Sequence, residues 1–143
     1  MITRFNVRAY AIIIKDNRIL LADETIDDFS FTKFPGGGVE LGEGLLDALR
    51  RELMEEGEIE MLDAEHLYTT DFFQVSAFKP HDQIISVYYK VKADIVWDEK
   101  MSDQSRPDNF HSIRLYFYPL DELSEETLTF PIDKVVLKNF LKR

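Results

Sequence analysis

The acidic residues of this chain cluster around residues 52–60, where Glu52, Glu55 and Glu56 stand three and four residues apart. At about 100° per residue of an α-helix, the three carboxylates fall within an arc of roughly 100°, beside an apolar stripe that includes Leu49 and Leu53. Like charges at this spacing repel one another, and a hard divalent cation with oxygen ligands, Mg²⁺ or Mn²⁺, would remove that repulsion. The group is therefore either a metal site or the solvated face of an acidic helix.

A run of glycines precedes this helix and favours the metal site. Gly36, Gly37 and Gly38 follow Pro35, and residues 39–43 lead directly into the acidic segment. Consecutive glycines let the backbone approach a ligand closely and leave its carbonyl and amide groups free to contact it. Two isolated glycines would indicate only a flexible turn, whereas this loop combined with the glutamate spacing indicates a ligand site.

The loop and the helix together resemble the Nudix family. The family pattern is Gly, any five residues, Glu, any seven, Arg-Glu, an aliphatic residue, any one, Glu-Glu, any one, Gly and an aliphatic residue. This chain matches it over residues 37–59 with Gly37, Glu43, Arg51, Glu52, Leu53, Glu55, Glu56 and Ile59. It departs from the pattern at Glu58, which stands where the family has its last glycine, so we expect the helix to be capped one residue early, at Gly57.

The resemblance implies an α/β/α sandwich, with a mixed β-sheet between helices, and a role for each matching residue. It makes the three helix glutamates metal ligands and Glu52 the first choice for the base that deprotonates the attacking water, although a further glutamate remains an alternative. It makes Glu43 and Arg51 a pair that holds the loop against the helix; the rival interpretation is that Arg51 clamps a phosphate. A backbone carbonyl of Gly36 or Gly37 is expected to complete the metal site.

Residues outside the matching segment are harder to assign. Arg4, Arg8 and Lys33 are candidates for neutralising substrate phosphates, or are ordinary surface charges. Family members often take one more acidic ligand from the loop before a late strand, where this chain has Asp103 and Asp108, which also suit turn capping. Four aromatic residues could stack on a base, although core packing is the commoner fate of such side chains: Phe72, Phe73, Tyr88 and Phe110. His66, His81 and His111 show no ligand spacing, and we expect them to be structural or exposed.

The elements that must position these residues can be read from hydrophobic periodicity. Residues 8–14 are apolar and β-branched, typical of a strand buried on both faces, and Asp16-Asn17 predicts a hairpin turn into a second arm at residues 18–22. Residues 44–56 are helical, and a final helix opens at Pro131. The other expected elements are strands over residues 29–34, 66–73, 83–92 and 113–118, and a polar loop over residues 97–110.

Composition limits the protein class. The chain has 143 residues without cysteine, a length suited to one domain over residues 1–143 that needs no disulfides. No signal peptide is indicated and the longest apolar run is too short to cross a bilayer, so we expect a cytoplasmic protein without membrane association. The net charge of −10 disfavours DNA or RNA as a general partner.

We therefore expect a divalent-metal-dependent pyrophosphohydrolase that cleaves a phosphoanhydride bond in a nucleoside diphosphate linked to another group. Nucleoside triphosphates, nucleotide sugars and capped RNA ends all remain possible substrates, with long RNA the least suited to so acidic a chain. The alternative is a Nudix-fold sensor without catalysis, although the intact carboxylates favour the enzyme. Isopentenyl diphosphate isomerisation, which in the family relies on a cysteine, is set aside. Because dimerisation is common in the Nudix family, a homodimer is a further possibility.

Overall fold

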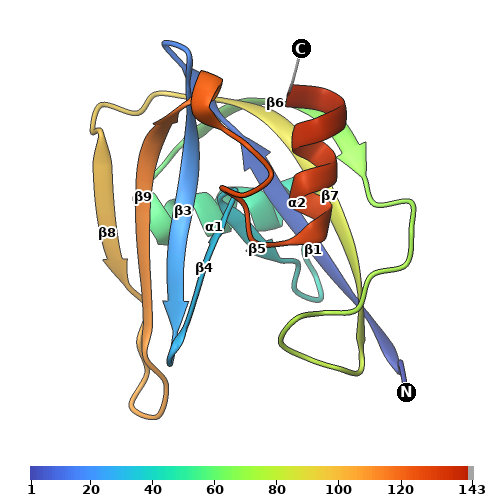
Figure 1. Ribbon diagram of the computed structural model, residues 1–143. Coiled ribbons are helices and arrows are strands. Elements are labelled where there is room, and N and C mark those ends of the chain that lie inside the picture. The colour runs from blue at the N-terminus through green and yellow to red at the C-terminus, as the bar shows by residue number, and fades with distance from the viewer. Residues whose placement is uncertain (142–143) are drawn as a thin grey trace.

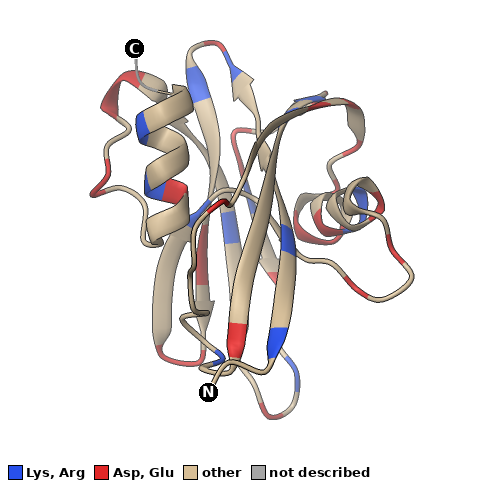
Figure 2. Ribbon diagram, turned by 90° about the vertical axis from the view of Figure 1, so that its right-hand side faces the viewer, with Lys and Arg blue, Asp and Glu red and all other residues tan. Residues whose placement is uncertain are grey.

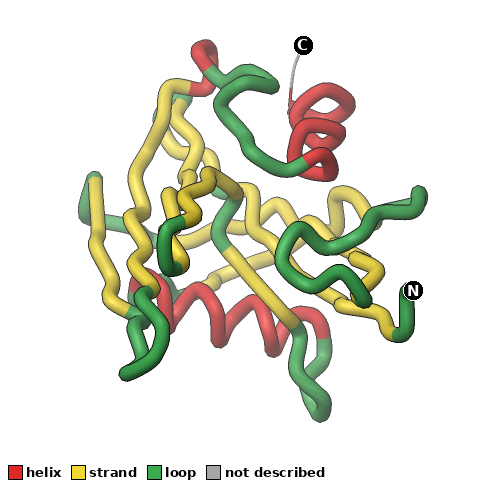
Figure 3. Tube along the Cα trace, turned by 60° about the horizontal axis from the view of Figure 1, so that its bottom comes forward, coloured by secondary structure: helices red, strands yellow, loops and turns green. Residues whose placement is uncertain are grey.

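The computed structural model describes residues 1–141, and its strands form two sheets that lie between two helices (Figure 1). Figures 2 and 3 show the helices on opposite sides of the strands, so the α/β/α arrangement expected from the sequence is confirmed. The elements in chain order are β1 (Arg4–Ile12), β2 (Ile14–Lys15), β3 (Arg18–Ile26), β4 (Phe29–Lys33), β5 (Gly36–Gly38), α1 (Leu45–Gly57), β6 (Met61–Thr69), β7 (Asp82–Ala93), β8 (Glu99–Asp103), β9 (His111–Pro119), a 3₁₀ turn (Leu120–Glu122), α2 (Pro131–Val136) and a π-helical turn (Leu137–Leu141).

The first sheet is mixed and the second is antiparallel. The first has the strand order β5-β1-β7-β6, in which β1 and β7 are parallel and the other neighbours are antiparallel. The second has the order β2-β3-β9-β8. The strand β4 also pairs with β3, on the same edge as β2 but further along β3. The mixed sheet predicted from the sequence is therefore one of two sheets, and the glycine strand β5 lies at its edge.

The hairpin expected between residues 8–14 and 18–22 is confirmed only next to its turn, where Ile14 and Lys15 pair with Ile19 and Arg18. Asp16 and Asn17 do form a tight turn with positive φ angles of 52° and 58°, as this pair of residues favours. The turn, however, joins β3 to the two-residue strand β2 and not to β1. The chain leaves the first sheet at Ile13 and enters the second, so β1 pairs with β5 and β7 instead.

Two hydrophobic cores lie on the two faces of the strands, and alternation along each strand divides its side chains between them. On β1, Ala9 and Ala11 face α1, whose Leu49 and Leu53 are fully buried there. Tyr10 and Ile12 face the other way, toward α2. Small side chains under α1 therefore let that helix pack close to β1, which brings its carboxylates near the glycine strand.

The end of α1 differs from the expected early cap at Gly57. Gly57 is the last helical residue, and Glu58 takes the left-handed cap conformation with φ 53° and ψ 38°. A Cβ on Gly57 would lie 2.5 Å from the Leu115 side chain, so close packing is the reason for that glycine. Glu58 thus occupies, with an ordinary side chain, the position at which glycine is usually preferred.

Two further boundaries were predicted wrongly. The segment 97–110, expected to be a loop, contains the edge strand β8, whose polar residues pair with β9. The strand expected at residues 66–73 runs from Met61 to Thr69 instead. Polar side chains on an edge strand give no apolar alternation, which is why the sequence pattern missed both. None of the helices described in residues 1–141 is long and apolar enough to span a membrane.

Candidate active site

A cavity of about 620 Å³ lies between α1, the glycine strand and the start of α2. Glu52, Glu55 and Glu56 all line it, together with Gly36, Gly37 and Gly38. The helix glutamates and the glycine turn, which the sequence could only relate by spacing, therefore meet at one concave site. The three carboxylates differ in exposure: Glu56 is buried, Glu52 is partly buried and the Glu55 side chain is half exposed.

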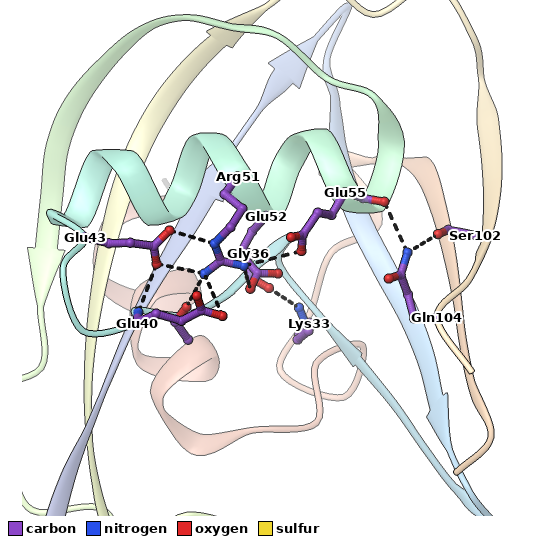
Figure 4. A network of polar contacts seen from close by, with 10 residues as sticks. Lys33, Gly36, Glu40, Glu43, Arg51, Glu52, Glu55, Ser102 and Gln104 are labelled. Atoms are coloured by element: carbon purple, nitrogen blue, oxygen red, sulfur yellow. Dashed lines mark hydrogen bonds and ion pairs between the residues drawn. The ribbon is translucent and has the colours of Figure 1, made fainter. Parts of the chain in front are cut away.

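Arg51 is the centre of a polar network that ties α1 to the glycine turn (Figure 4). Its Nε and Nη2 donate to both carboxylate oxygens of Glu43 at 2.7 and 2.9 Å. Its Nη2 also donates to the Gly38 carbonyl at 2.9 Å, and Nη1 donates to Glu52 and Glu55 at 3.0 and 3.3 Å. A guanidinium has five N–H donors, and these five bonds use all of them.

This network has a clear electrostatic effect on Glu43. The hydrogen bonds from the Arg51 guanidinium lower the pKa of Glu43 to about 2, helped by a backbone N–H from Glu40. The same bonds raise the pKa of Arg51 further above its ordinary value. Because the arginine is saturated by protein acceptors, the geometry favours the loop-holding role over the phosphate clamp.

The glycine strand is shaped by two close approaches. Gly36 has a φ of +138°, and a Cβ there would lie 2.2 Å from the Ala9 carbonyl oxygen. A Cβ on Gly37 would lie 2.7 Å from the carboxyl carbon of Glu52. Both positions therefore require glycine, the first for packing against β1 and the second so that Glu52 can approach the backbone.

The direction of the carbonyls follows from how this strand pairs with β1. Ala11 N–H donates to Pro35 O and Val39 N–H donates to Val7 O, each at 2.8–2.9 Å. The polar groups of residues 35 and 39 thus point toward β1, and because these groups alternate along a strand, those of Gly37 do so too. The carbonyls of Gly36 and Gly38 point away from β1, which favours Gly36 over Gly37 as the backbone ligand.

Glu56 is the most perturbed carboxylate at the site. Its Oε1 is buried and has no hydrogen-bond partner among the described residues. Burial raises the pKa of Glu56 well above its ordinary range, and the neighbouring Glu52 and Glu24 raise it further, while Lys33 opposes the shift. A buried carboxylate with an unsatisfied oxygen is stabilised by a cation, so this atom fits a metal ligand.

The donor set also fits a hard divalent cation, being composed of carboxylate and carbonyl oxygens. Within residues 1–141, no three acidic or histidine side chains converge tightly enough to form a complete metal site on their own. Arg51 pairs with Glu52 and Glu55 at 3.0 and 3.3 Å, so these two carboxylates already have a cationic partner, whereas Glu56 Oε1 has no hydrogen-bond partner among the described residues.

A buried ion pair lies beneath the glycine turn. The Lys33 side chain is only 5% exposed, and its ammonium lies 2.8 Å from Glu24 Oε2 and donates to the Gly36 carbonyl at 2.9 Å. Glu24 Oε1 in turn contacts His111 Nε2 at 2.8 Å. Burial alone would raise the pKa of Glu24, yet Lys33 and His111 lower it below its ordinary value. Glu24 and His111 line the cavity and were not singled out as site residues in the sequence.

The three basic residues expected to meet phosphate lie in different places. Arg8 and Lys33 line the cavity, whereas Arg4 lies outside it and is paired with Asp82 at 2.5 Å. Arg8 donates through Nε to Tyr10 Oη at 2.5 Å. Its terminal Nη groups make no hydrogen bond within the described chain, so they can donate to a ligand.

The loop before β9 contributes to the cavity, but not through its aspartates. Asp103 and Asp108 are exposed and do not line the cavity; Asp103 accepts the Ser105 N–H at 2.9 Å, the turn-capping role considered as its alternative. Gln104 and Arg106 line it instead. Gln104 Nε2 donates to the Glu55 backbone carbonyl at 3.1 Å, which joins this loop to the end of α1 (Figure 4).

The end of the cavity away from α1 is aromatic. Phe31, Phe78 and Phe130 line it with ring centroids 5.2–6.0 Å apart. Of the four aromatic candidates from the sequence, only Tyr88 lines the cavity, and its hydroxyl donates to the buried Asp133 at 2.5 Å. The three phenylalanines come from separate segments of the chain, so no sequence spacing relates them, although Phe31 was part of a recognisable aromatic alternation.

Comparison with solved structures agrees with this architecture. The solution structure of the ORF135 protein of E. coli is 24% identical, with a TM-score of 0.66 over 98% of this chain and 90% of that one. A MutT NUDIX hydrolase from Burkholderia pseudomallei is 22% identical, with a TM-score of 0.67 over 96% and 98%. A MutT protein from Bacillus halodurans is 19% identical, with a TM-score of 0.67 over 97% and 84%. At such low identities these similarities establish the fold.

The fold and the site together define an α/β/α hydrolase whose helix glutamates face a glycine turn. The family model described as the NUDIX domain matches residues 4–140, and the chain belongs to that family. It is accordingly a hydrolase that acts on pyrophosphate bonds. A comparison with curated proteins found no significant match.

Proposed function

We propose that this protein is a Mg²⁺- or Mn²⁺-dependent pyrophosphohydrolase of a small nucleoside diphosphate derivative. One observation carries the proposal: the same cavity joins the glutamates and glycine turn at one end to an aromatic surface at the other. A substrate with a charged pyrophosphate and a planar ring suits those two ends. The cavity volume of about 620 Å³ lies within the range of small-molecule sites.

At the acidic end, Glu52, Glu55, Glu56 and the Gly36 carbonyl would hold the cation. When bound, the cation neutralises the pyrophosphate and lowers the pKa of the attacking water. The water oxygen attacks one phosphorus, the bond from that phosphorus to the bridging oxygen breaks, and a carboxylate takes the water's proton. Glu52 remains our first choice for this base, because the open Cα of Gly37 gives its carboxyl group direct access to the turn.

The other cavity residues would bind the substrate. Arg8 presents its free guanidinium nitrogens to the phosphates, and Lys33 adds positive charge from within the wall. Phe31, Phe78 and Phe130 provide surfaces for a base or another planar group, and Arg106 stands at the loop before β9. Arg4 does not line the cavity and is paired with Asp82, so we assign it no direct contact with the substrate.

The finer substrate assignment stays a prediction. Nucleoside triphosphates and nucleotide sugars are both compatible with a cavity of this size, and the net charge of −10 makes a long nucleic acid the least suitable ligand. A cytoplasmic location, the absence of DNA binding and a possible homodimer are retained from the sequence as predictions.

The proposal is tested by phosphate and pyrophosphate release from a panel of nucleoside triphosphates and nucleotide sugars, with Mg²⁺ and with a chelator. We expect turnover only with the metal, and a loss of roughly 100-fold or more in Glu56→Gln. Glu60→Gln is the matched control, since Glu60 is an exposed glutamate just beyond the same helix and outside the cavity. Turnover that survives both chelation and Glu56→Gln contradicts the metal mechanism. Tight nucleotide binding without turnover of any substrate indicates a sensor instead.

A further inference from the structure

The buried Lys33 contacts one carboxylate and two backbone carbonyls of the protein. Its Nζ lies 2.8 Å from Glu24 Oε2, donates to the Gly36 carbonyl at 2.9 Å and donates to the Phe34 carbonyl at 3.3 Å. The two carbonyls accept hydrogen bonds, whereas the contact with Glu24 is an ion pair, because Glu24 Oε2 accepts no hydrogen bond within the described residues. These contacts hold the ammonium inside the protein, against the Gly36 carbonyl.

These contacts form a chain that crosses from one sheet to the other. His111 on β9 contacts Glu24 on β3, Glu24 pairs with Lys33 on β4, and Lys33 donates to Gly36 on β5. The first three strands belong to the five-stranded sheet, whereas β5 is the edge of the four-stranded sheet. Lys33 thus adds a side-chain contact between the second sheet and the glycine strand of the first.

Lys33 donates to the Gly36 carbonyl, which is the backbone group that we propose as a metal ligand. The carbonyls of Gly36 and Gly38 point away from β1, and each is held by a cationic side chain: Gly36 by Lys33 and Gly38 by Arg51. A carbonyl oxygen has two lone pairs, so one can accept from Lys33 while the other faces a cation. A hydrogen bond on the first lone pair fixes the plane of the peptide and so the direction of the second.

We infer that Lys33 is a positioning residue for the metal site, which holds the Gly36 carbonyl in its binding orientation from within the protein. The inference rests on the proposed function, since it concerns the same cation. Glu24 and His111 support Lys33 in this role, because they anchor the ammonium and balance its charge. Mutation of an outer partner that orients a metal ligand typically lowers metal affinity by roughly 10- to 100-fold.

The decisive variant removes the contact without changing the local charge. Lys33→Met alone would leave Glu24 buried without its partner, so the test uses the double variant Glu24→Gln with Lys33→Met, which removes one negative and one positive group together. Glu24→Gln alone keeps Lys33 on the Gly36 carbonyl and reports the effect of the carboxylate. Lys15→Met is the matched control, because the Lys15 ammonium also donates to a backbone carbonyl, that of Ile95 at 2.7 Å, away from the cavity.

The measurement is Mn²⁺ binding to the substrate-free protein, by electron paramagnetic resonance of the free ion, with folding verified by circular dichroism. We expect the double variant to bind Mn²⁺ at least about tenfold more weakly than wild type, and more weakly than Glu24→Gln. Lys15→Met should bind as wild type does. Equal or tighter binding in the folded double variant overturns the inference, while an absence of Mn²⁺ binding in wild type overturns the proposed function itself.

A second measurement uses the unmodified protein and does not depend on the variant folding. In isotope-labelled wild type, the Lys33 ammonium should give a solvent-protected ¹⁵N signal, and its coupling to the Gly36 carbonyl should persist when Mg²⁺ is added. The Gly36 carbonyl shift should change during the same titration. Loss of the Lys33 coupling on Mg²⁺ addition, or an unchanged Gly36 carbonyl, contradicts the inferred role.

Discussion

Asp133 gives a pH-dependent prediction that can be worked from its surroundings. It lies in the first turn of α2, is buried, and accepts a hydrogen bond from the Tyr88 hydroxyl at 2.5 Å. Burial raises the pKa of Asp133 from 3.8 to about 6, although Tyr88, Lys33 and Arg8 all act in the opposite direction. The folded protein therefore holds this proton more tightly than the unfolded chain does.

The raised pKa determines the sign and the size of the effect. Well below pH 3.8 the carboxyl is protonated in both states and costs nothing. As the pH rises from 3.8 through about 6, the unfolded chain loses the proton first, so the free energy of unfolding falls with pH. Roughly two pKa units at about 1.4 kcal/mol each give a penalty of about 3 kcal/mol above pH 7.

Asp133→Asn removes the ionisation and keeps an oxygen that can accept from Tyr88. We expect the variant to be more stable than wild type by up to about 3 kcal/mol at pH 8, and by only about 1 kcal/mol at pH 4.5. Urea unfolding of the metal-free proteins at pH 4.5, 6 and 8 measures this difference. Asp63→Asn is the control, because Asp63 is exposed on β6. A stability difference that does not change with pH, or a variant less stable than wild type at pH 8, refutes the reasoning.

Three further outcomes follow from the same geometry. Glu58→Gly should raise the free energy of unfolding by about 1 kcal/mol, because Glu58 has a positive φ that glycine adopts without strain. The ion pair with Lys100 that the variant loses is exposed and contributes little. A destabilised variant in urea unfolding would contradict this. Gly37→Ala should fold but lose roughly 100-fold in turnover, because the new Cβ would lie only 2.7 Å from the carboxyl carbon of Glu52 and would push that carboxyl group out of position. An unchanged kcat would contradict this prediction. Mg²⁺ at 100 times its Kd should stabilise wild type by about 2.7 kcal/mol in thermal or urea unfolding and should not stabilise Glu56→Gln; equal stabilisation of both would place the cation elsewhere.

Local patterns were the successful part of the sequence-based prediction. The spacing of Leu49 and Leu53 predicts the buried stripe of α1, and both are fully buried. The run at residues 8–14 predicts a strand covered on both faces, which the opposite directions of Ala9 and Tyr10 confirm. Such patterns are readable because each depends only on the geometry of one element.

Predictions that required contacts between distant segments were weaker. The strand β8 and the crossing of the chain at Ile13 were missed, because strand pairing is chosen by partners elsewhere in the fold. The Phe78–Phe130 contact and the Glu24–His111 contact each join segments more than fifty residues apart. No periodicity of a single helix or strand relates such residues, so the sequence pattern could not predict these contacts.

The sequence by itself determined that a glycine turn and three glutamates one helical turn apart stand next to each other, because both lie in one short stretch of chain. It also determined that the backbone at the turn can approach a ligand closely, since three consecutive glycines carry no side chains that would prevent it. Only the tertiary structure decided which carbonyl faces the cavity, which lysine is buried beneath it, and which aromatic rings line the far end. Those features depend on how two sheets pack, and packing brings together side chains whose separation along the chain carries no information about their distance in space.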